Sequence, residues 1–247
     1  MLRSAREILS YHLLATDGKI GEVKDFLFDD REWKVWYVVA DTRRWLPGRL
    51  VLLAPADIGS PNYQDSTLAV ALSQDKIKDS PLLNFDRPVS RQKEAELHRY
   101  YGWPAYWVPP PPPGGMPPMP PSSPDPSIRA HQEQEGDPHL RSVREVHDYK
   151  VKANDGESGV VADLIIDFDT WNIRHLVIDP RRWTSGTTVL VPTESVRSVS
   201  WDESSVHLNC TRTDLEHSPE YDPKKPVNVE HHVYYTDFRG KPADRRM

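Results

Sequence analysis

The chain has a single cysteine among its 247 residues, which excludes an internal disulfide framework and any site built from several thiolates. The longest apolar runs, such as Val35 to Ala40, span six or seven residues, against the roughly 20 that a membrane-crossing helix needs. Basic residues are not in excess either, since 31 Lys and Arg face 37 Asp and Glu for a net charge of −6. We therefore expect a cytoplasmic protein with no transmembrane segment and no nucleic-acid partner, and peripheral membrane association stays open.

Proline, in contrast, is abundant and concentrated. Of the 24 prolines, 11 fall between Pro109 and Pro126, in a stretch with no periodic apolar pattern to bury. We interpret residues 109–138 as a Pro-rich, disordered linker between two globular domains, residues 1–108 and 139–247, each large enough for its own core. The alternative for such a segment is a ligand for an adaptor domain with an aromatic groove.

The chain contains a tandem duplication. Sliding the sequence against itself by 138 residues, without a gap, superposes residues 2–104 on 140–242 with about thirty identities. One stretch reads DGKIGEVKDFLFDDREWKVWYVVADTRRW from Asp17 and DGESGVVADLIIDFDTWNIRHLVIDPRRW from Asp155. The opening LRSAREILSY has its counterpart LRSVREVHDY after the linker, where no signal peptide can act. We therefore interpret the first residues as the start of a domain.

Each repeat has the pattern of several short strands with turn residues between them. The structural turn residues are Asp17, Gly18 and Gly21 in the first repeat and Asp155, Gly156 and Gly159 in the second. Asp-Gly has the residue types of a tight turn with positive φ, and a glycine within a strand marks a bulge or a close backbone approach. The expected strands are 19–29, 35–41, 50–53 and 67–72, and 157–167, 173–179, 188–191 and 205–211. One short helix is expected near the end of each repeat, within 91–101 and 229–238. Such spacing predicts a mainly β fold, with each repeat a small barrel closed on itself.

Taken together, these segments resemble the PRC-barrel family, named for the cytoplasmic domain of the H subunit of the purple bacterial photosynthetic reaction centre. The resemblance is carried by the DGxxG hairpin entry, the strand exits DFLFDD and DLIIDF, the strand ends DTRRWLPG and DPRRWTSG, and the segments SPLLNFDRPV and SPEYDPKKPV. It covers both repeats. It implies two small, strongly bent PRC-type β-barrels in tandem, which the family uses as interaction or assembly modules.

The matched acids invite a catalytic interpretation, above all Asp25 with Asp29 and Asp163 with Asp167. On a strand, however, four residues span roughly 13 Å, whereas paired carboxyls in glycoside hydrolysis lie about 5 to 9.5 Å apart. We interpret these acids as solvated or turn-capping carboxylates at strand ends. No histidine occupies the same position in both copies, so we expect no metal site, no cofactor and no catalytic set. Cys210, in an alternating strand, is most simply a small buried apolar side chain.

The most suggestive polar features are two matched triplets, Arg43-Arg44-Trp45 and Arg181-Arg182-Trp183. Arg and Trp are enriched at protein interfaces, which makes the triplets our candidate interaction surface. The alternative is structural, with each Trp closing a barrel end and each Arg pairing with Asp41 or Asp179.

The duplication without a matched catalytic set predicts a non-enzymatic interaction or assembly module whose partner is another protein. The two barrels can also pair with each other within the chain, or the chain can form a homo-oligomer. Two other functions stay open. One is a peripheral component of a photosynthetic reaction centre or another electron-transfer complex, which the resemblance to the H subunit implies, and the other is a small-ligand-binding protein or hydrolase.

Overall fold

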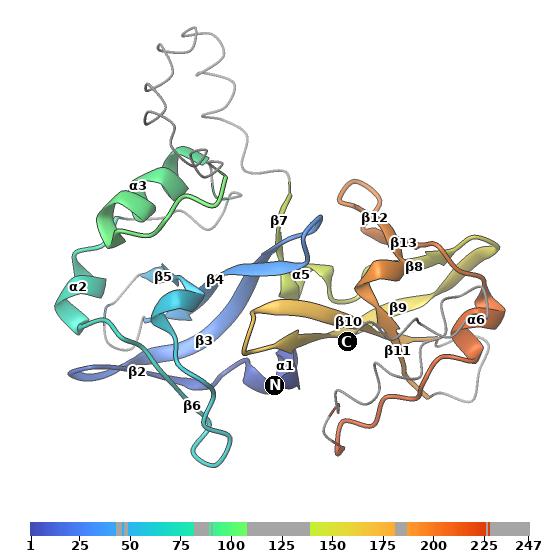
Figure 1. Ribbon diagram of the computed structural model, residues 1–247, viewed down its shortest axis with the longest axis horizontal. Coiled ribbons are helices and arrows are strands. Elements are labelled where there is room, and N and C mark those ends of the chain that lie inside the picture. Colours follow the sequence, from blue (N-terminus) through green and yellow to red (C-terminus); the bar gives the residue numbers. More distant parts are fainter. Residues whose placement is uncertain are drawn as a thin grey trace, which may run out of the picture.

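The computed structural model describes residues 1–42, 46, 49–81, 89, 91–107, 139–180, 187–225 and 227. The two repeats lie side by side, the first in blue to green and the second in yellow to red (Figure 1). Within the described residues the fold is mainly β, as predicted, and its thirteen strands belong to one curled sheet. The expectation that each repeat closes into a barrel of its own is not confirmed and stays a prediction.

The elements of the first repeat follow the chain in a simple order. They are β1 (Leu2–Ser4), α1 (Ala5–Ile8), β2 (His12–Ala15), β3 (Gly18–Asp29), β4 (Lys34–Asp41), β5 (Leu50–Leu53), the 3-10 turn η1 (Pro55–Asp57), β6 (Thr67–Ala69), α2 (Gln74–Lys78) and α3 (Arg91–Tyr101).

The second repeat has the same order up to its last short helix. Its elements are β7 (Leu140–Ser142), α5 (Val143–Val146), β8 (Lys150–Ala153), β9 (Gly156–Asp167), β10 (Asn172–Asp179), β11 (Val189–Pro192), η2 (Thr193–Ser195), β12 (Val196–Ser200), β13 (Ser205–Leu208) and α6 (Arg212–Glu216).

In each repeat a long central strand carries the sheet. β3 pairs antiparallel with β2 and β4, and β9 pairs antiparallel with β8 and β10. β5 and β11 add to β4 and β10, while β6 and β13 lie parallel to β2 and β8. The predicted central strands and the first-repeat helix at 91–101 are confirmed, most of them to within a residue.

Glycine is required where the long strands bend. Gly21 has a φ of +145°, and a Cβ there would lie 2.0 Å from the carbonyl oxygen of Asp41. Gly159 has a φ of +117°, and its Cβ would lie 2.3 Å from the carbonyl oxygen of Asp179. The register of β2 on β3 and of β8 on β9 shifts beside these glycines. Both predicted features, a bulge and a close backbone approach, are therefore present in each repeat.

The first strand of each repeat pairs with the other repeat. β1 runs antiparallel to β9, with Leu2 opposite Asp167, and β7 runs antiparallel to β3, with Leu140 opposite Asp29. β10 and β4 meet at Asn172 and Lys34, which joins the strands of the two repeats into one sheet. Each half therefore supplies a strand to the other.

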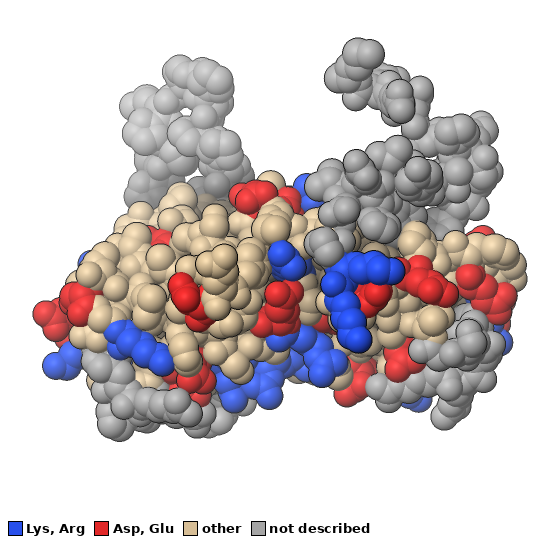
Figure 2. All heavy atoms as spheres, turned by 90° about the horizontal axis from the view of Figure 1, so that it is seen from below, with Lys and Arg blue, Asp and Glu red and all other residues tan. Residues whose placement is uncertain are grey.

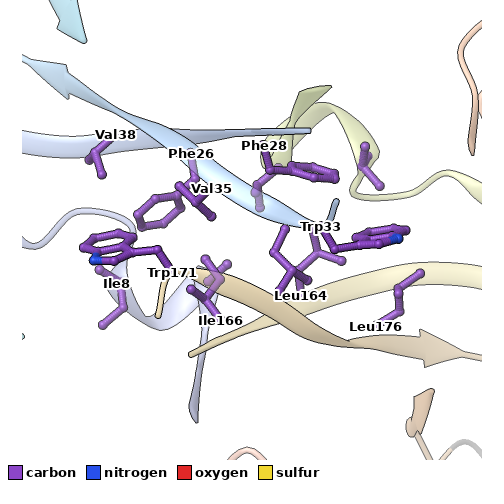
Figure 3. Close-up of a cluster of buried hydrophobic side chains, with 14 of the residues drawn as sticks. Ile8, Phe26, Phe28, Trp33, Val35, Val38, Leu164, Ile166, Trp171 and Leu176 are labelled. Atoms are coloured by element: carbon purple, nitrogen blue, oxygen red, sulfur yellow. The ribbon is translucent and has the colours of Figure 1, made fainter. Parts of the chain in front are cut away.

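One hydrophobic core fills the space between the repeats. Its buried side chains include those of β3 and β4 of the first repeat and of β9 and β10 of the second, and in Figure 3 these point toward one another. The ring of Phe26 packs edge-on against that of Phe168, with centroids 6.1 Å apart. Since burial of apolar surface is the main favourable term in folding, this shared core couples the stability of the two halves.

The outer face of the sheet is covered differently in each half. In the first repeat, α3 lies over β4 and β5, where its Leu97 belongs to a cluster with Tyr37 and Leu52. In the second repeat, Tyr221 and Val227 pack on Leu190, and the N–H of Leu190 donates to the carbonyl of Pro219 at 2.9 Å. Among the described residues, a helix covers part of the outer face of the first repeat, and the segment 219–225 together with Val227 covers part of that of the second.

Several short elements were not predicted from the sequence, namely β1, β7 and β12 and the helices α1, α2, α5 and α6. β2 and β8 complete the hairpins that the two Asp-Gly turns indicate. β6 and β13 are shorter than the predicted strands, because they end at Ala69 and Leu208. The helix expected within 229–238 and the linker at 109–138 lie outside the described residues.

Candidate functional site

The two Arg-Arg-Trp triplets predicted as the interaction surface, Arg43 to Trp45 and Arg181 to Trp183, lie outside the described residues. The prediction that they bind a partner stays a prediction, as does the structural alternative.

The turn residues act as anchors for helices far along the chain. The carboxylate of Asp17 accepts a hydrogen bond from the N–H of Gln74 at 2.8 Å, and Asp155 accepts one from the N–H of Arg212 at 3.0 Å. Gln74 and Arg212 are the first residues of α2 and α6. Gly18 and Gly156 both have positive φ, as predicted for the tight turns. Each Asp-Gly turn therefore also caps a short helix.

Asp25 and Asp163 join the two repeats. Asp25 accepts hydrogen bonds from the hydroxyl of Ser142 and the N–H of Arg144, and Asp163 accepts them from the hydroxyl of Ser4 and the N–H of Arg6. Burial raises the pKa of both carboxyls, although these hydrogen bonds act in the opposite direction. The interpretation of this pair as solvated or turn-capping groups is wrong, because they hold the helix start of the other repeat.

Asp29 and Asp167 do cap turns, as predicted. Asp29 accepts hydrogen bonds from the N–H groups of Arg31 at 2.8 Å and Glu32 at 3.1 Å, and Asp167 accepts one from the hydroxyl of Thr170 at 2.9 Å. Desolvation acts to raise the pKa of each carboxyl, but the hydrogen bonds outweigh it and the pKa values lie below the usual range. The four matched acids therefore have structural partners.

Trp33 and Trp171 lie where the starts of β4 and β10 meet, a contact between the repeats that we call the junction. Both have left-handed backbone, with φ of 53° and 60°, which is uncommon for a bulky side chain. The carbonyl of Trp171 accepts the N–H of Val35 at 2.8 Å, and the carbonyl of Trp33 accepts the N–H of Ile173 at 2.6 Å. The indoles lie on opposite sides of the shared core (Figure 3). This reciprocal pair of backbone hydrogen bonds joins the two turns.

Beside this junction lies an aromatic cleft of about 590 Å³, which we call the junction cleft. Its walls come from β4, from the segment around η1, from the end of α3 and from the turn between β9 and β10 of the second repeat. The residues are Lys34 to Tyr37, Ala54 to Ala56, Ile58 to Ser60, His98, Trp103, Pro104 and Phe168 to Trp171. A volume of this order, a lining that combines apolar and aromatic side chains, and a place at the boundary between two units are typical of ligand-binding sites.

The end of α3 is folded back to form one wall of the junction cleft. Gly102 has a φ of +80° and donates its N–H to the carbonyl of His98 at 2.8 Å, as a glycine that ends a helix does. The chain then brings Trp103 to η1, where its Nε1–H donates to Asp57 at 2.6 Å. Trp36 is held between the ring of Tyr106, stacked at 3.9 Å, and the ammonium of Lys34, at 4.8 Å.

A buried polar network supports this wall from behind. The Tyr37 hydroxyl lies 2.9 Å from Oε1 of Glu94 and 2.7 Å from Nε2 of His98, and Nδ1 of His98 lies 2.9 Å from the carbonyl oxygen of Pro104. A carbonyl only accepts, so Nδ1 carries a proton, and the single Tyr37 proton goes either to Glu94 or to Nε2. In both arrangements each ring nitrogen of His98 is engaged, so the network fixes α3 on β4.

Other chemistry-bearing groups are dispersed. Among the described residues no three His, Cys, Asp or Glu side chains form a cluster that could hold a metal ion. Cys210 is buried, as predicted, and burial raises the pKa of its thiol to about 11. On the face shown in Figure 2, basic and acidic side chains are interspersed. In the part of the chain that the structure describes, no helix has the length and apolar character to span a membrane.

A scan against protein-family models finds no match to this chain. A search of curated proteins finds no similar sequence either.

The junction cleft was missed at the level of sequence, although one signal was present. The segment YYGWPAYW, from Tyr100 to Trp107, contains five aromatic residues in eight positions. The contribution of Phe168 to Trp171 could not be foreseen, because it depends on how the repeats pack together.

Proposed function

We propose that the protein is a cytoplasmic, non-enzymatic interaction or assembly module of the PRC-barrel type, with two tandem barrels joined by a Pro-rich linker. Its partner is another protein. The observation that carries the proposal is that residues matched between the repeats and residues that are not matched have different positions in the fold. Matched polar and aromatic groups hold the repeats together, while an unmatched aromatic cleft is open beside them.

The engagement of the titratable groups supports binding over catalysis. Asp25 and Asp163 accept hydrogen bonds from the opposite repeat, and both ring nitrogens of His98 have partners. A general base must have a lone pair within reach of the proton that it removes. The buried acids and the cleft histidine are instead occupied by the fold.

The proposal is tested by affinity purification of the tagged full chain from its host, followed by quantitative mass spectrometry. The expected result is one protein enriched in a fixed ratio to the bait. Two double variants probe the triplets in parallel, Arg43→Ala with Arg44→Ala and the matched Arg181→Ala with Arg182→Ala. Loss of the same protein from one double variant but not from its match would assign the contact to that repeat.

The contrary result has two parts. The full chain would enrich no protein in a fixed ratio, and a metabolite screen would raise its melting temperature in a concentration-dependent manner. That combination would replace the interaction module by a small-ligand-binding protein.

A further inference from the structure

The contacts between the repeats occur in matched pairs. The first strand of each repeat pairs antiparallel with the long strand of the other. The serine at the end of each first strand donates its hydroxyl to an aspartate of the opposite repeat. An interface built from such reciprocal contacts is the kind that two identical subunits form across a two-fold axis. Each repeat therefore presents the face of a dimer subunit.

An arginine on each first strand follows the same matching. The guanidinium of Arg3 lies 4.2 Å from the centre of the Tyr63 ring, and that of Arg141 lies 5.1 Å from the centre of the Trp201 ring. Tyr63 and Trp201 are counterparts at the offset of 138 residues, as the two arginines are. Each guanidinium is therefore positioned by an aromatic ring of its own repeat.

A buried ion pair across the two repeats breaks the matching. Asp30, which follows β3, accepts a hydrogen bond from Nε of Arg141 at 2.8 Å, and its other oxygen lies 2.9 Å from Nδ1 of His139. The side chains of Asp30 and Arg141 are only 6% and 10% exposed. The counterpart of Asp30 is Phe168, whose ring packs on that of Phe26. The acid of this pair is therefore present in the first repeat alone.

This difference determines which repeats can pair. If two second repeats met in the same geometry, each Arg141 would lie beside Phe168 and would have no carboxylate partner there. A buried charge that has lost its partner is strongly destabilising. Pairs of first repeats are disfavoured too, because they leave the second repeats only each other. Selection of a partner or register is the best-attested role of a buried polar pair.

The segment between the repeats decides only whether the two partners come from one chain. The residues that form the contacts above all lie before residue 108 or after residue 138. A tether of 31 residues raises the concentration of the partner within the chain to about the millimolar range, but it adds no contact to the pair. A repeat of another chain offers the same contacts.

We propose that the junction is a pairing surface for a second copy of this chain, in which Asp30 and Arg141 direct each first repeat to a second repeat. Two chains then form a closed dimer, where the first repeat of each chain pairs with the second repeat of the other. Every contact between repeats in the monomer is made twice in this dimer. The monomer prevails at low concentration because of the tether, and the dimer gains as the chain concentration rises or the pairing within one chain weakens.

The test uses two full-length chains with different tags, one carrying Asp30→Arg and the other Arg141→Asp. Each variant alone places like charges side by side within its own chain. When the two chains pair with each other, both ion pairs join opposite charges again. After co-expression, light scattering on the eluted protein should show a dimer of twice the chain mass that carries both tags. The double variant, with both substitutions in one chain, should elute as a monomer.

Arg3→Asp is the matched control for Arg141→Asp. Arg3 is the counterpart of Arg141, but it lies on β1 against β9 and not beside Asp30. Co-expression of the Asp30→Arg chain with the Arg3→Asp chain should therefore give no dimer that carries both tags. An equal yield of dimer in the two mixtures would show that the ion pair does not select the partner, and would overturn that part of the proposal.

The wild-type chain supplies a test that does not depend on how the variants fold. Wild-type chains with the two tags are unfolded together and refolded at chain concentrations from about 0.01 to 1 mM. The share of dimer that carries both tags should increase with concentration. Monomers alone, both in this experiment and in the co-expression of Asp30→Arg with Arg141→Asp, would overturn the assignment of the junction as a surface for a second copy.

Discussion

The two halves of the molecule agree where they touch each other and differ where they face outward. At the junction, Asp25 and Asp163, Ser4 and Ser142, and the two turn tryptophans form the same contacts twice. On the outer face, among the described residues, a helix with an aromatic network lies over the first half and the segment 219–225 lies over the second. The comparison indicates that the two copies are held together by residues kept in both, whereas described residues on their outer faces, such as Tyr37 and its counterpart His175, have diverged.

The largest effect on stability is expected where a side chain is added at the close backbone approach in either half. Gly21→Val and Gly159→Val each drive a Cβ into backbone carbonyls, at a φ that a β-branched residue does not adopt. Each should destabilise the protein by about 4 kcal/mol or more, and by a similar amount in both halves. Denaturant titration measures the change.

Gly18→Val is the control, because its Cβ would meet the movable end of the Gln74 side chain and not backbone. It should cost about 1–3 kcal/mol, from the positive φ alone. An equal loss at Gly18 and Gly21 would contradict the argument from close approach.

The junction tryptophans give the next largest effect. Trp33→Ala and Trp171→Ala remove matched side chains from the shared core and should each cost about 3–5 kcal/mol. Trp201→Ala, at an exposed site where the ring contacts Arg141, should cost less than about 1 kcal/mol. If one junction tryptophan proved neutral and the other essential, the two halves would not be equivalent at their junction.

A smaller and local effect is expected on the outer face of the first half. Tyr37→Phe removes the hydroxyl between Glu94 and His98 and should cost about 1–3 kcal/mol. Hydrogen exchange should show lost protection in α3 and unchanged protection in β9 and β10. Uniform loss across both halves would mean that the outer face is not independent of the junction.

The smallest expected effect is a change in how the free energy of unfolding depends on pH. The raised pKa of Asp25 means that the folded protein binds this proton more tightly than the unfolded chain does, so this group's contribution to stability increases as pH falls from neutrality through the folded pKa toward about 4. Asp25→Asn should therefore reduce the gain in unfolding free energy that accompanies a fall in pH, and Asp163→Asn should do the same. Urea titrations between pH 4 and 7 measure this pH dependence. If both variants kept the pH dependence of the wild type, burial would not be raising the pKa of these carboxyls.

The sequence predicted the long strands well because their apolar pattern and flanking glycines are local. Lys34–Asp41 and Asn172–Asp179 needed no knowledge of the rest of the chain. The short elements were not predicted because segments of three to five residues are stabilised by tertiary contacts and not by intrinsic propensity.

The candidate site was less accessible to prediction for a related reason. β1 pairs with a strand more than 160 residues away, and no local pattern encodes this exchange. The left-handed Trp33 and Trp171 oppose the usual preference of bulky residues, so only their partner across the junction explains them. The junction cleft follows from that packing, and its aromatic segment could be seen in the sequence without its position being known.

The central claim, that strand exchange and a shared core make the two halves one unit, is tested most directly by cutting the chain between them. A specific protease site is introduced between Pro113 and Gly114, and the cleaved protein is examined by size-exclusion chromatography with light scattering. We expect the two fragments to remain together at the mass of the intact chain and to separate only in denaturant. Elution of two independently folded fragments under native conditions would contradict the account.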